Sequence, residues 1–261
     1  MRPLAQLDPR PIEAVLVDID ETLTTRGKLT AEAYAALERL QRGGKRVVPV
    51  TGRAAGWCDH IARMWPVDAV VGENGAFYFW FGDGKLRKRF VDDAATRAAK
   101  RARLEAIAGT ILREVAGAAL ATDQAYRETD LAIDFCEDVP PLPLAAAARI
   151  AELMRQAGLT AKVSSIHVNG WFGDYDKLAT ARLLFAERFG ANLDDANRKV
   201  VFAGDSPNDA PMFEFFANSV GVANVRRFAG LKPKFVTGAE AGAGFAELAA
   251  HLLKTPGAQS S

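Results

Sequence analysis

Short unbroken apolar runs alternate with helical patterns in the first third of the chain, and again in the last third. Such runs are typical of parallel strands that are buried on both faces. The strands expected from them are 12–17, 46–50, 68–71, 199–203, 219–222 and 234–236. Residues 30–42 and 176–190 predict two of the intervening helices, each with a polar first residue and a closing glycine. This order predicts an α/β fold with a doubly wound parallel sheet.

The pattern changes between these two parts. Residues 76–81 and 86–91 flank a Gly-Asp-Gly-Lys turn and predict a β-hairpin. The elements expected next are a helix at 92–115, strands at 121–127 and 131–136, a helix at 144–156, and strands at 160–164 and 166–172. This order suits a small α+β unit with an antiparallel sheet. We therefore expect residues 83–172 to be an insertion into a parallel unit formed by 1–82 and 173–261.

A helix carrying Trp57, Ile61 and Met64 is also expected before Pro66. The chain has 261 residues, 49% of them hydrophobic, which is enough for a sizeable core. The formal net charge of +1 gives no reason to expect nucleic acid or a membrane as a partner.

Only two cysteines, Cys58 and Cys136, are present, and no apolar run approaches the roughly 20 residues of a membrane span. The first eleven residues lack the apolar segment of a signal peptide. These features predict a cytoplasmic protein, as a monomer or a homodimer.

Four polar clusters follow strands or open a helix of the parallel unit: Asp18 with Asp20, Thr51-Gly52-Arg53, the segment 174–177 with Lys177, and Asp205 with Asp209. In a doubly wound sheet such positions meet at one edge. They supply carboxylates, a hydroxyl and an ammonium, and Mg²⁺ prefers a few carboxylates plus phosphate oxygens. The clusters predict a phosphate-handling site with Mg²⁺ as its cofactor. For Asp18 and Asp20 an ordinary surface turn stays open, as does a helix cap for Thr51.

Asp18-Ile19-Asp20-Glu21-Thr22 resembles the first motif, DxDx(T/V), of the haloacid dehalogenase (HAD) superfamily. Thr51-Gly52-Arg53 looks like the second motif, Lys177 like the third, and the segment 204–209 like the fourth. The inserted unit is similar to the C2-type cap of the sugar-phosphatase branch. Glu21 departs from the pattern, because many members carry Gly there. The resemblance implies a Rossmann-like core with an inserted α+β cap.

The resemblance also implies the catalytic roles. Asp18 would be the nucleophile that forms an aspartyl-phosphate, and Asp20 would be the general acid and then the general base. Thr51 would hold the transferring phosphoryl group, and Lys177 would neutralise charge. Mg²⁺ would be held by Asp18, Asp205 and the backbone carbonyl of Asp20, with Asp209 binding directly or through water.

Substrate recognition is expected where the inserted unit meets the parallel unit. The candidate side chains and loop positions are Gly52, Arg53, Asn74, His167, Asn169, Trp171 and Asn208. His167 and Asn169 alternate on one expected strand and therefore share a face. A histidine that only packs or lies at the surface stays an alternative for His167.

These expectations together describe a Mg²⁺-dependent phosphomonoester hydrolase that acts on a small phosphorylated metabolite, with sugar phosphates as the first class. Two other functions stay open. Phosphomutases of the phosphomannomutase type share this core and cap type. A non-catalytic sugar-phosphate sensor would keep the fold without the turnover.

Overall fold

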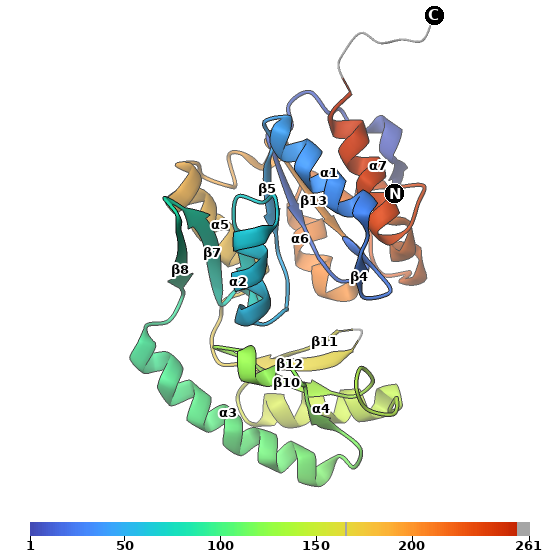
Figure 1. Ribbon diagram of the computed structural model, residues 1–261. Helices are drawn as coiled ribbons and strands as arrows, with labels where there is room; N and C mark the ends of the chain where they lie inside the picture. The colour runs from blue at the N-terminus through green and yellow to red at the C-terminus, as the bar shows by residue number, and fades with distance from the viewer. Residues whose placement is uncertain (165, 255–261) are drawn as a thin grey trace, which may run out of the picture.

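The computed structural model describes residues 1–164 and 166–254, which form two bodies joined by two crossings of the chain (Figure 1). The larger one, called the core body here, contains a six-stranded parallel sheet. Its strands, from edge to edge, are β1 (Arg2–Pro3), β15 (Phe235–Val236), β14 (Asn218–Gly221), β13 (Val200–Gly204), β2 (Ala14–Val17) and β5 (Arg46–Pro49). The mixed α/β architecture with a parallel central sheet is the one that the hydrophobic pattern predicts.

Helices cover both faces of this sheet. α1 (Ala31–Arg42), α2 (Ala55–Met64) and α7 (Ala241–Leu252) pack on one face, and α5 (Lys177–Phe189) and α6 (Ala210–Phe215) pack on the other. Within β2, Val15 and Val17 belong to the first apolar cluster and Leu16 to the second. The unbroken apolar run of this strand is thus explained, because both of its faces are buried.

The helix expected before Pro66 is α2, and of Trp57, Ile61 and Met64 only Ile61 is buried. Trp57 and Met64 are 48% and 64% exposed, whereas Cys58, Ile61 and Ala62 are buried. The buried face of α2 thus carries Ile61 together with the smaller residues Cys58 and Ala62. The Trp57 ring instead lies under the Arg53 guanidinium, whose central carbon is 5.2 Å from the ring centroid.

A second, three-stranded sheet extends the core body, and its strands are β6 (Val70–Gly72), β7 (Phe77–Gly82) and β8 (Lys85–Phe90). A parallel bridge between Val50 and Val71 connects it to the end of β5. Asp83 and Gly84, with φ of 53° and 69°, make the tight turn between β7 and β8.

The expected division at residues 82 and 83 cuts through this hairpin. β8 pairs with β7 along its whole length, and Leu86 and Phe90 pack against the apolar cluster of the core body. The chain therefore leaves the core body only after Phe90, and we propose that the inserted unit begins at residues 91–93.

The smaller, cap body contains a four-stranded antiparallel sheet in the order β11 (Thr160–Val163), β12 (His167–Trp171), β10 (Leu131–Asp134) and β9 (Ala119–Leu120). α3 (Ala94–Glu114) and α4 (Leu144–Gln156) cover one face of this sheet (Figure 1). Val168 packs toward these helices, so its neighbours His167 and Asn169 point to the opposite face, which lies toward the core body.

The strand expected at 121–127 is absent. β9 ends at Leu120, and Gln124–Tyr126 form a short 3-10 helix. The Gln124 side chain donates to the Asp130 carbonyl and accepts from the Ala132 N–H, which closes the segment into a loop. Side-chain hydrogen bonds of this kind compete with strand pairing and leave no periodic signal.

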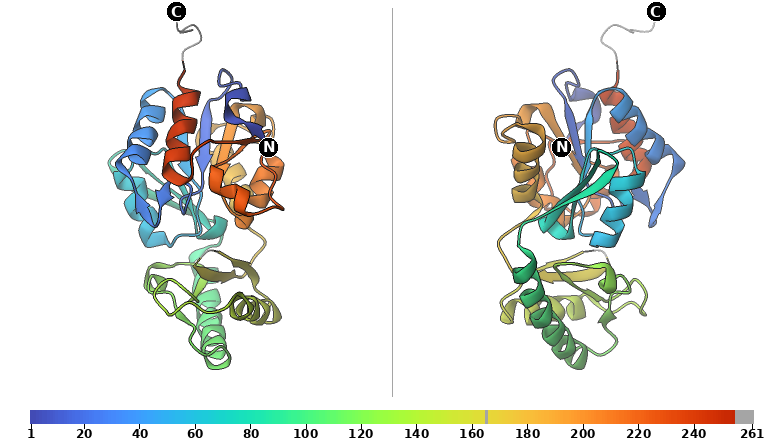
Figure 2. Two further views of the ribbon diagram at one scale, coloured as in Figure 1. Left: turned by 90° about the vertical axis from the view of Figure 1, so that its right-hand side faces the viewer. Right: turned by 60° about the vertical axis from the view of Figure 1, so that its left-hand side comes forward.

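The two crossings between the bodies lie at residues 91–93 and 172–175, and Figure 2 shows the bodies one above the other with the crossings between them. Lys100 ties them together, because its Nζ donates to Asp92 and, at 2.8 Å, to the Phe172 carbonyl. A small hairpin of β3 (Thr24–Thr25) and β4 (Lys28–Leu29) follows β2.

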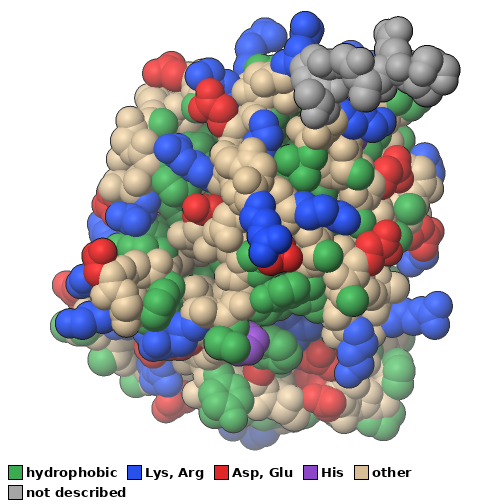
Figure 3. All heavy atoms as spheres, turned by 45° about the horizontal axis from the view of Figure 1, so that its top comes forward, with side chains coloured by type: hydrophobic (Ala, Val, Ile, Leu, Met, Phe, Trp, Pro, Cys, Tyr) green, Lys and Arg blue, Asp and Glu red, His purple; other side chains and the backbone are tan. Residues whose placement is uncertain are grey.

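Figure 3 shows one face of the molecule, on which basic and acidic side chains are interspersed. Among the helices described here, none is both long and apolar enough to cross a membrane.

Candidate active site

A buried ion pair lies at the carboxyl edge of the parallel sheet. Asp18 follows β2, and the Lys177 ammonium reaches it from the first turn of α5, with Nζ 2.7 Å from Oδ1. The same Nζ is 3.0 Å from Oδ1 of Asp209, in the loop after β13. A cation at a helix N-terminus opposes the helix dipole. The negative charges of Asp18 and Asp209 offset this unfavourable interaction of Lys177 with the helix dipole.

Three acids gather at this point. Asp18, Asp205 and Asp209 are all buried, and each offers a carboxylate oxygen within 4.8 Å of the others. Asp205 accepts hydrogen bonds from Thr22 Oγ1 at 3.3 Å and from Asn224 Nδ2 at 2.9 Å. Three carboxylates against one ammonium leave an excess of negative charge, which a divalent cation can balance.

Burial and crowding change the protonation of these acids. Burial raises the pKa of Asp18 well above its ordinary value, the Lys177 ammonium opposes the rise, and Asp209 and Asp205 add to it. Burial, with the charge of Asp209, raises the pKa of Asp205 to about 7. Burial alone would lower the pKa of Lys177, but the charges of Asp18 and Asp209 raise it above its ordinary value. The ammonium is therefore charged at neutral pH.

Asp209 is placed differently from its two neighbours. Its Oδ2 accepts the backbone N–H of Asp205 at 3.1 Å and of Ser206 at 3.4 Å, while its Oδ1 faces Lys177. Asn208 turns its Oδ1 toward Ser206 Oγ, 2.6 Å away. Both of these side chains hold the loop that presents Asp205.

Asp20 has surroundings unlike those of Asp18. Its side chain is about one third exposed and is held by Arg53, with Nη2 2.7 Å and Nε 3.1 Å from the carboxylate. Arg53 also lies 3.7 Å from Glu137 of the cap body. The Asp20 side chain does not belong to the three-acid cluster. Any part it has in metal binding is therefore left to its backbone carbonyl.

Thr51 and Gly52 form a tight loop after β5. Thr51 is completely buried, and its Oγ1 accepts the backbone N–H of Arg53 at 3.0 Å. A Cβ on Gly52 would lie 3.1 Å from the Asn74 side chain, so the absence of a side chain lets Asn74 approach. Asn74, with a φ of 56°, lines the cavity beside this loop.

The cap body contributes His167 and Asn169 from β12, as expected. Asn169 Nδ2 donates to Asp130 at 3.1 Å. His167 Nε2 lies 2.8 Å from Glu137, but the two groups are not aligned as a hydrogen bond. Trp171, also considered from the sequence, is elsewhere. It is fully buried in the core-body cluster, where its Nε1 donates to the Tyr175 carbonyl.

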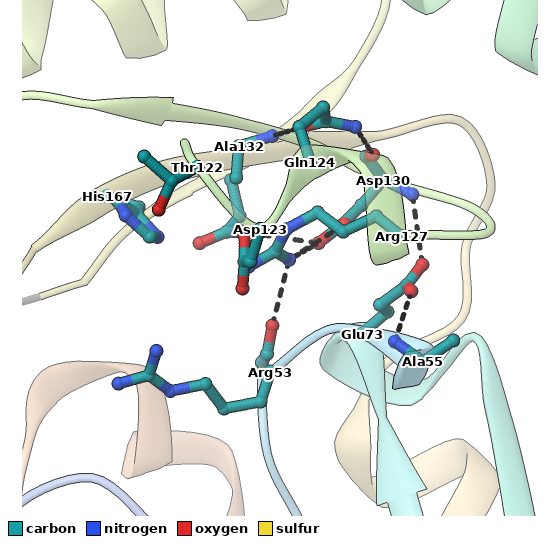
Figure 4. Close-up of polar contacts among 12 residues, drawn as sticks. Arg53, Ala55, Glu73, Thr122, Asp123, Gln124, Arg127, Asp130, Ala132 and His167 are labelled. Carbon is teal, nitrogen blue, oxygen red and sulfur yellow. Dashed lines mark hydrogen bonds and ion pairs between the residues drawn. The ribbon is translucent and has the colours of Figure 1, made fainter. Parts of the chain in front are cut away.

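Arg127 is a buried arginine of the cap body that sequence reasoning missed. Its Nε is 2.9 Å from Asp123, and its Nη1 is 2.9 Å from Asp130 and 3.1 Å from the Gly52 carbonyl (Figure 4). It thus connects the cap body to the loop that carries Thr51. No periodicity or spacing around Arg127 distinguishes it from the many surface arginines of the chain.

Glu73 makes a second connection that the sequence analysis did not single out. This buried carboxylate of the core body accepts the N–H groups of Glu128 and Thr129 and the hydroxyl of Thr129. It also accepts the N–H groups of Ala55 and Asp130 (Figure 4). Burial, together with Asp130, raises its pKa to about 7. Like Asp18 and Asp205, Glu73 is an acid that directly follows an apolar strand, here β6. The same sequence signal could therefore have identified it.

A cavity of about 670 Å³ opens between the two bodies over these residues. Its core-body wall includes Asp18, Asp20, Gly52, Arg53, Asn74, Asp205 and Asn208. Its cap-body wall includes Arg127, His167 and Asn169. The volume is typical of small-molecule sites. The cavity thus exposes Asp18, Asp20 and Asp205 to a small molecule, with the Lys177 ammonium buried directly behind Asp18, and such a set of groups suits phosphoryl transfer.

Comparisons with known proteins agree with this chemistry. A family model described as haloacid dehalogenase-like hydrolase matches residues 15–100. A phosphoglycolate phosphatase of Haloarcula marismortui is 27% identical over 237 residues, which cover 90% of this chain and 95% of that protein.

Two solved structures are similar over most of the chain. One is a Thermoplasma acidophilum protein, with a TM-score of 0.71, 18% identity and coverage of 93% of this chain and 99% of that one. The other is the sucrose-phosphatase of Synechocystis, solved with sucrose and phosphate, with a TM-score of 0.64, 17% identity and coverage of 92% and 97%. At these identities the structural likeness shows the fold.

Proposed function

Because the chain is a phosphatase of the haloacid dehalogenase superfamily, we propose that it is a Mg²⁺-dependent phosphomonoester hydrolase that works through an aspartyl-phosphate on Asp18. The observation that carries the proposal is the Lys177 ammonium, 2.7 Å from the Asp18 carboxylate beside the three-acid cluster. An isolated buried acid would be neutral and a poor nucleophile. Lys177 and a cation both favour the ionised form of Asp18.

The donor set fits Mg²⁺. The three acids are buried, offer only hard oxygen ligands and exceed the charge of Lys177. We assign Asp18, Asp205 and the backbone carbonyl of Asp20 as the ligands, and place Asp209 behind them because its oxygens already face Lys177 and two N–H groups. When bound, the ion supplies positive charge against the phosphoryl oxygens.

In the first half of the reaction, an Asp18 oxygen attacks phosphorus and the bond from phosphorus to the leaving oxygen breaks. Asp20 donates a proton to that oxygen. In the second half, water attacks the phosphorus, Asp20 takes the proton of the water, and the bond to Asp18 breaks to release phosphate. Arg53 holds Asp20 in place for both steps. Thr51 Oγ1 accepts from Arg53 N–H, so its own proton is left for a phosphoryl oxygen.

The substrate is proposed to be a small phosphorylated sugar. Asn74, His167, Asn169 and Asn208 line the cavity, and their amide and imidazole groups can exchange hydrogen bonds with hydroxyls. The Synechocystis relative is named a sucrose-phosphatase and the Haloarcula relative a phosphoglycolate phosphatase. Both kinds of compound belong in the first substrate panel. The names favour hydrolysis over the phosphomutase and sensor alternatives.

The test is release of inorganic phosphate from this panel with Mg²⁺ and with a chelator. We expect release only with the ion. Asp18→Asn should reduce release by at least about a thousandfold, because the nucleophile is lost. Asp195→Asn, which changes an exposed acid, is the matched control. Turnover by Asp18→Asn would contradict the proposal. Isomerisation of a sugar phosphate without net phosphate release would indicate a mutase instead.

A further inference from the structure

The wall of the cavity changes from polar to apolar between its depth and its mouth. The deep cap-body residues Arg127, His167 and Asn169 are 2%, 3% and 6% exposed. At the mouth, Leu144, Val163 and Phe228 are 78%, 38% and 39% exposed. Leu144 is the most exposed large apolar side chain of the described residues.

These three mouth residues come from separate elements. Leu144 opens α4, Val163 ends β11, and Phe228 follows a short helix of the core body at Ala223–Arg227. Pro141, Leu142 and Ile166 line the same cavity between them. A single exposed apolar side chain needs no explanation, but several that converge on one cavity mark a binding site.

The charges of the cavity also favour a substrate with a single anionic group. Each of the three arginines that line it among the described residues is paired with carboxylates. Arg53 is paired with Asp20 and Glu137, Arg127 with Asp123 and Asp130, and Arg227 with Glu240. Arg53 and Arg127 are therefore engaged by the protein's own carboxylates, whereas the exposed pair of Arg227 with Glu240, with side chains 63% and 56% exposed, is weak.

We propose that the substrate is an amphipathic phosphomonoester. Its single phosphate lies at Asp18, a hydroxylated middle part faces His167 and Asn169, and an uncharged apolar group lies against Leu144, Val163 and Phe228. This inference rests on the proposed function and narrows its substrate class. Because Arg53 and Arg127 are already paired, we expect compounds with a second anion, such as phosphoglycolate and sugar bisphosphates, to be poorer substrates.

The occupant of the apolar mouth is the substrate itself, because the mouth and the phosphate chemistry share one continuous cavity. Covering the mouth removes exposed apolar surface from water, which favours binding. The gain from one well-covered side chain corresponds to about tenfold in kcat/KM.

The experiment compares glucose 6-phosphate with phenyl β-glucoside 6-phosphate, which differ only in the apolar group. Phosphoglycolate and a series of straight-chain alkyl phosphates complete the set. We expect kcat/KM to be at least about tenfold higher for the phenyl glucoside, to rise with alkyl chain length, and to be lowest for phosphoglycolate.

The matched variants are Leu144→Asn at the mouth and Leu120→Asn on the exposed side of β9, outside the cavity. Leu144→Asn should reduce the phenyl preference at least about threefold, whereas Leu120→Asn should leave both this preference and glucose 6-phosphate turnover unchanged. The nearly isosteric Val163→Thr, combined with Leu144→Asn, should remove most of the preference.

The outcomes separate this inference from the proposed function. Equal or lower kcat/KM for the phenyl compound, or a preference unaffected by Leu144→Asn, would overturn the apolar subsite while hydrolysis stands. If alkyl phosphates were hydrolysed faster as their chains lengthen while both glucose compounds were inert, the apolar subsite would be supported. The proposed hydroxylated middle part of the substrate would then be overturned. Absence of hydrolysis across the whole set would overturn the proposed function, and this inference with it.

Discussion

At the scale of single residues, two acids only two positions apart meet opposite surroundings. Asp18 is buried against Lys177, whereas Asp20 is partly exposed and held by Arg53. Different surroundings are what separate roles for two carboxylates require. Between them and the hairpin that follows, Glu21 has a φ of 56°, a left-handed conformation that glycine adopts freely. Glu21 therefore adopts the turn that glycine would form here, but with some backbone strain, because a residue with a side chain is disfavoured in this conformation.

The first prediction concerns His167. Burial, followed by the positive charge of Arg127, lowers the pKa of this ring from 6.5 to about 4, although the negative charges of Asp123 and Asp134 oppose the shift. The unfolded chain therefore binds a proton that the folded protein does not. Stability from this residue is complete above pH 6.5 and is lost as the pH falls toward 4, by about 3 kcal/mol in total.

Urea unfolding at pH 7 and pH 4.5 measures this effect. The His167→Asn variant should lose less stability on acidification than the unmodified protein, by about 2 kcal/mol. His60→Asn reports the contribution of an exposed histidine of α2. Equal losses for the unmodified protein and His167→Asn would show that the buried ring is not held neutral.

The residues of the site differ in how far the sequence could predict them. Asp18 and Asp205 follow strands that are apolar throughout. Because burying a carboxylate there is energetically unfavourable, their positions alone predict a functional role. Arg127 is different, because its contact with the core body is made to the Gly52 carbonyl, which only the fold brings to it. A contact between distant segments leaves no trace in local spacing.

At the scale of elements, the turn after β6 positions α5. Gly75 has a φ of 105°, and a Cβ there would lie 2.1 Å from the Asp176 carbonyl oxygen and 2.8 Å from Lys177 N. Thr180 of α5 donates to the Gly75 carbonyl. The backbone of the turn thus touches the first turn of α5, which carries Lys177. The placement of the ammonium depends on a glycine in another element.

We therefore expect Gly75→Ala to displace Lys177. The clash is with backbone, which cannot rotate away, so stability should fall by about 3 kcal/mol and kcat by at least about tenfold. Gly84→Ala is the matched control, because Gly84 also has a positive φ of 69° but nothing within 4 Å of its Cβ. It should cost about 1 kcal/mol and leave kcat unchanged. A Gly75→Ala protein with unchanged kcat would show that the turn does not set the position of Lys177.

Elements with local signals were predictable, and those made by long-range contacts were not. α1 begins after Thr30, whose side chain accepts from Ala33 N, and α4 spans Leu144–Gln156 as its apolar spacing predicts. The prediction of a strand at 121–127 was wrong because the Gln124 side chain forms hydrogen bonds with the backbone at the start of β10 and just before it. The buried face of α2 was not predicted, because the small residues on it carry a weak hydrophobic signal.

At the scale of the whole molecule, the cavity exists only because the cap body lies against the core body. Glu73 is the main polar connection, since its two oxygens accept from Ala55 in the core body and from Glu128, Thr129 and Asp130 in the cap body. Arg127 adds a bond to the Gly52 carbonyl. Both connections end within the loop at 127–130, so this short segment carries the buried polar contacts of Glu73 and Arg127 between the two bodies.

Glu73→Gln should loosen this docking. At pH 8, above its pKa of about 7, Glu73 is an acceptor at both oxygens, and the variant replaces one acceptor with an amide that faces N–H donors. Buried donors without partners should lower the free energy of unfolding by about 3 kcal/mol. The effect should be local as well, because the core-body sheet keeps its own contacts while the segment at 127–130 loses its acceptor. We therefore expect faster amide hydrogen exchange at 128–130, unchanged exchange in β2 and β13, and a larger radius of gyration in solution scattering.

The control variant, Glu114→Gln, removes an exposed ion pair within the cap body and should change stability by less than about 0.5 kcal/mol. If Glu73→Gln left both exchange at 128–130 and scattering unchanged, the two bodies would be held together by their apolar and crossing contacts, and the polar connection would be dispensable.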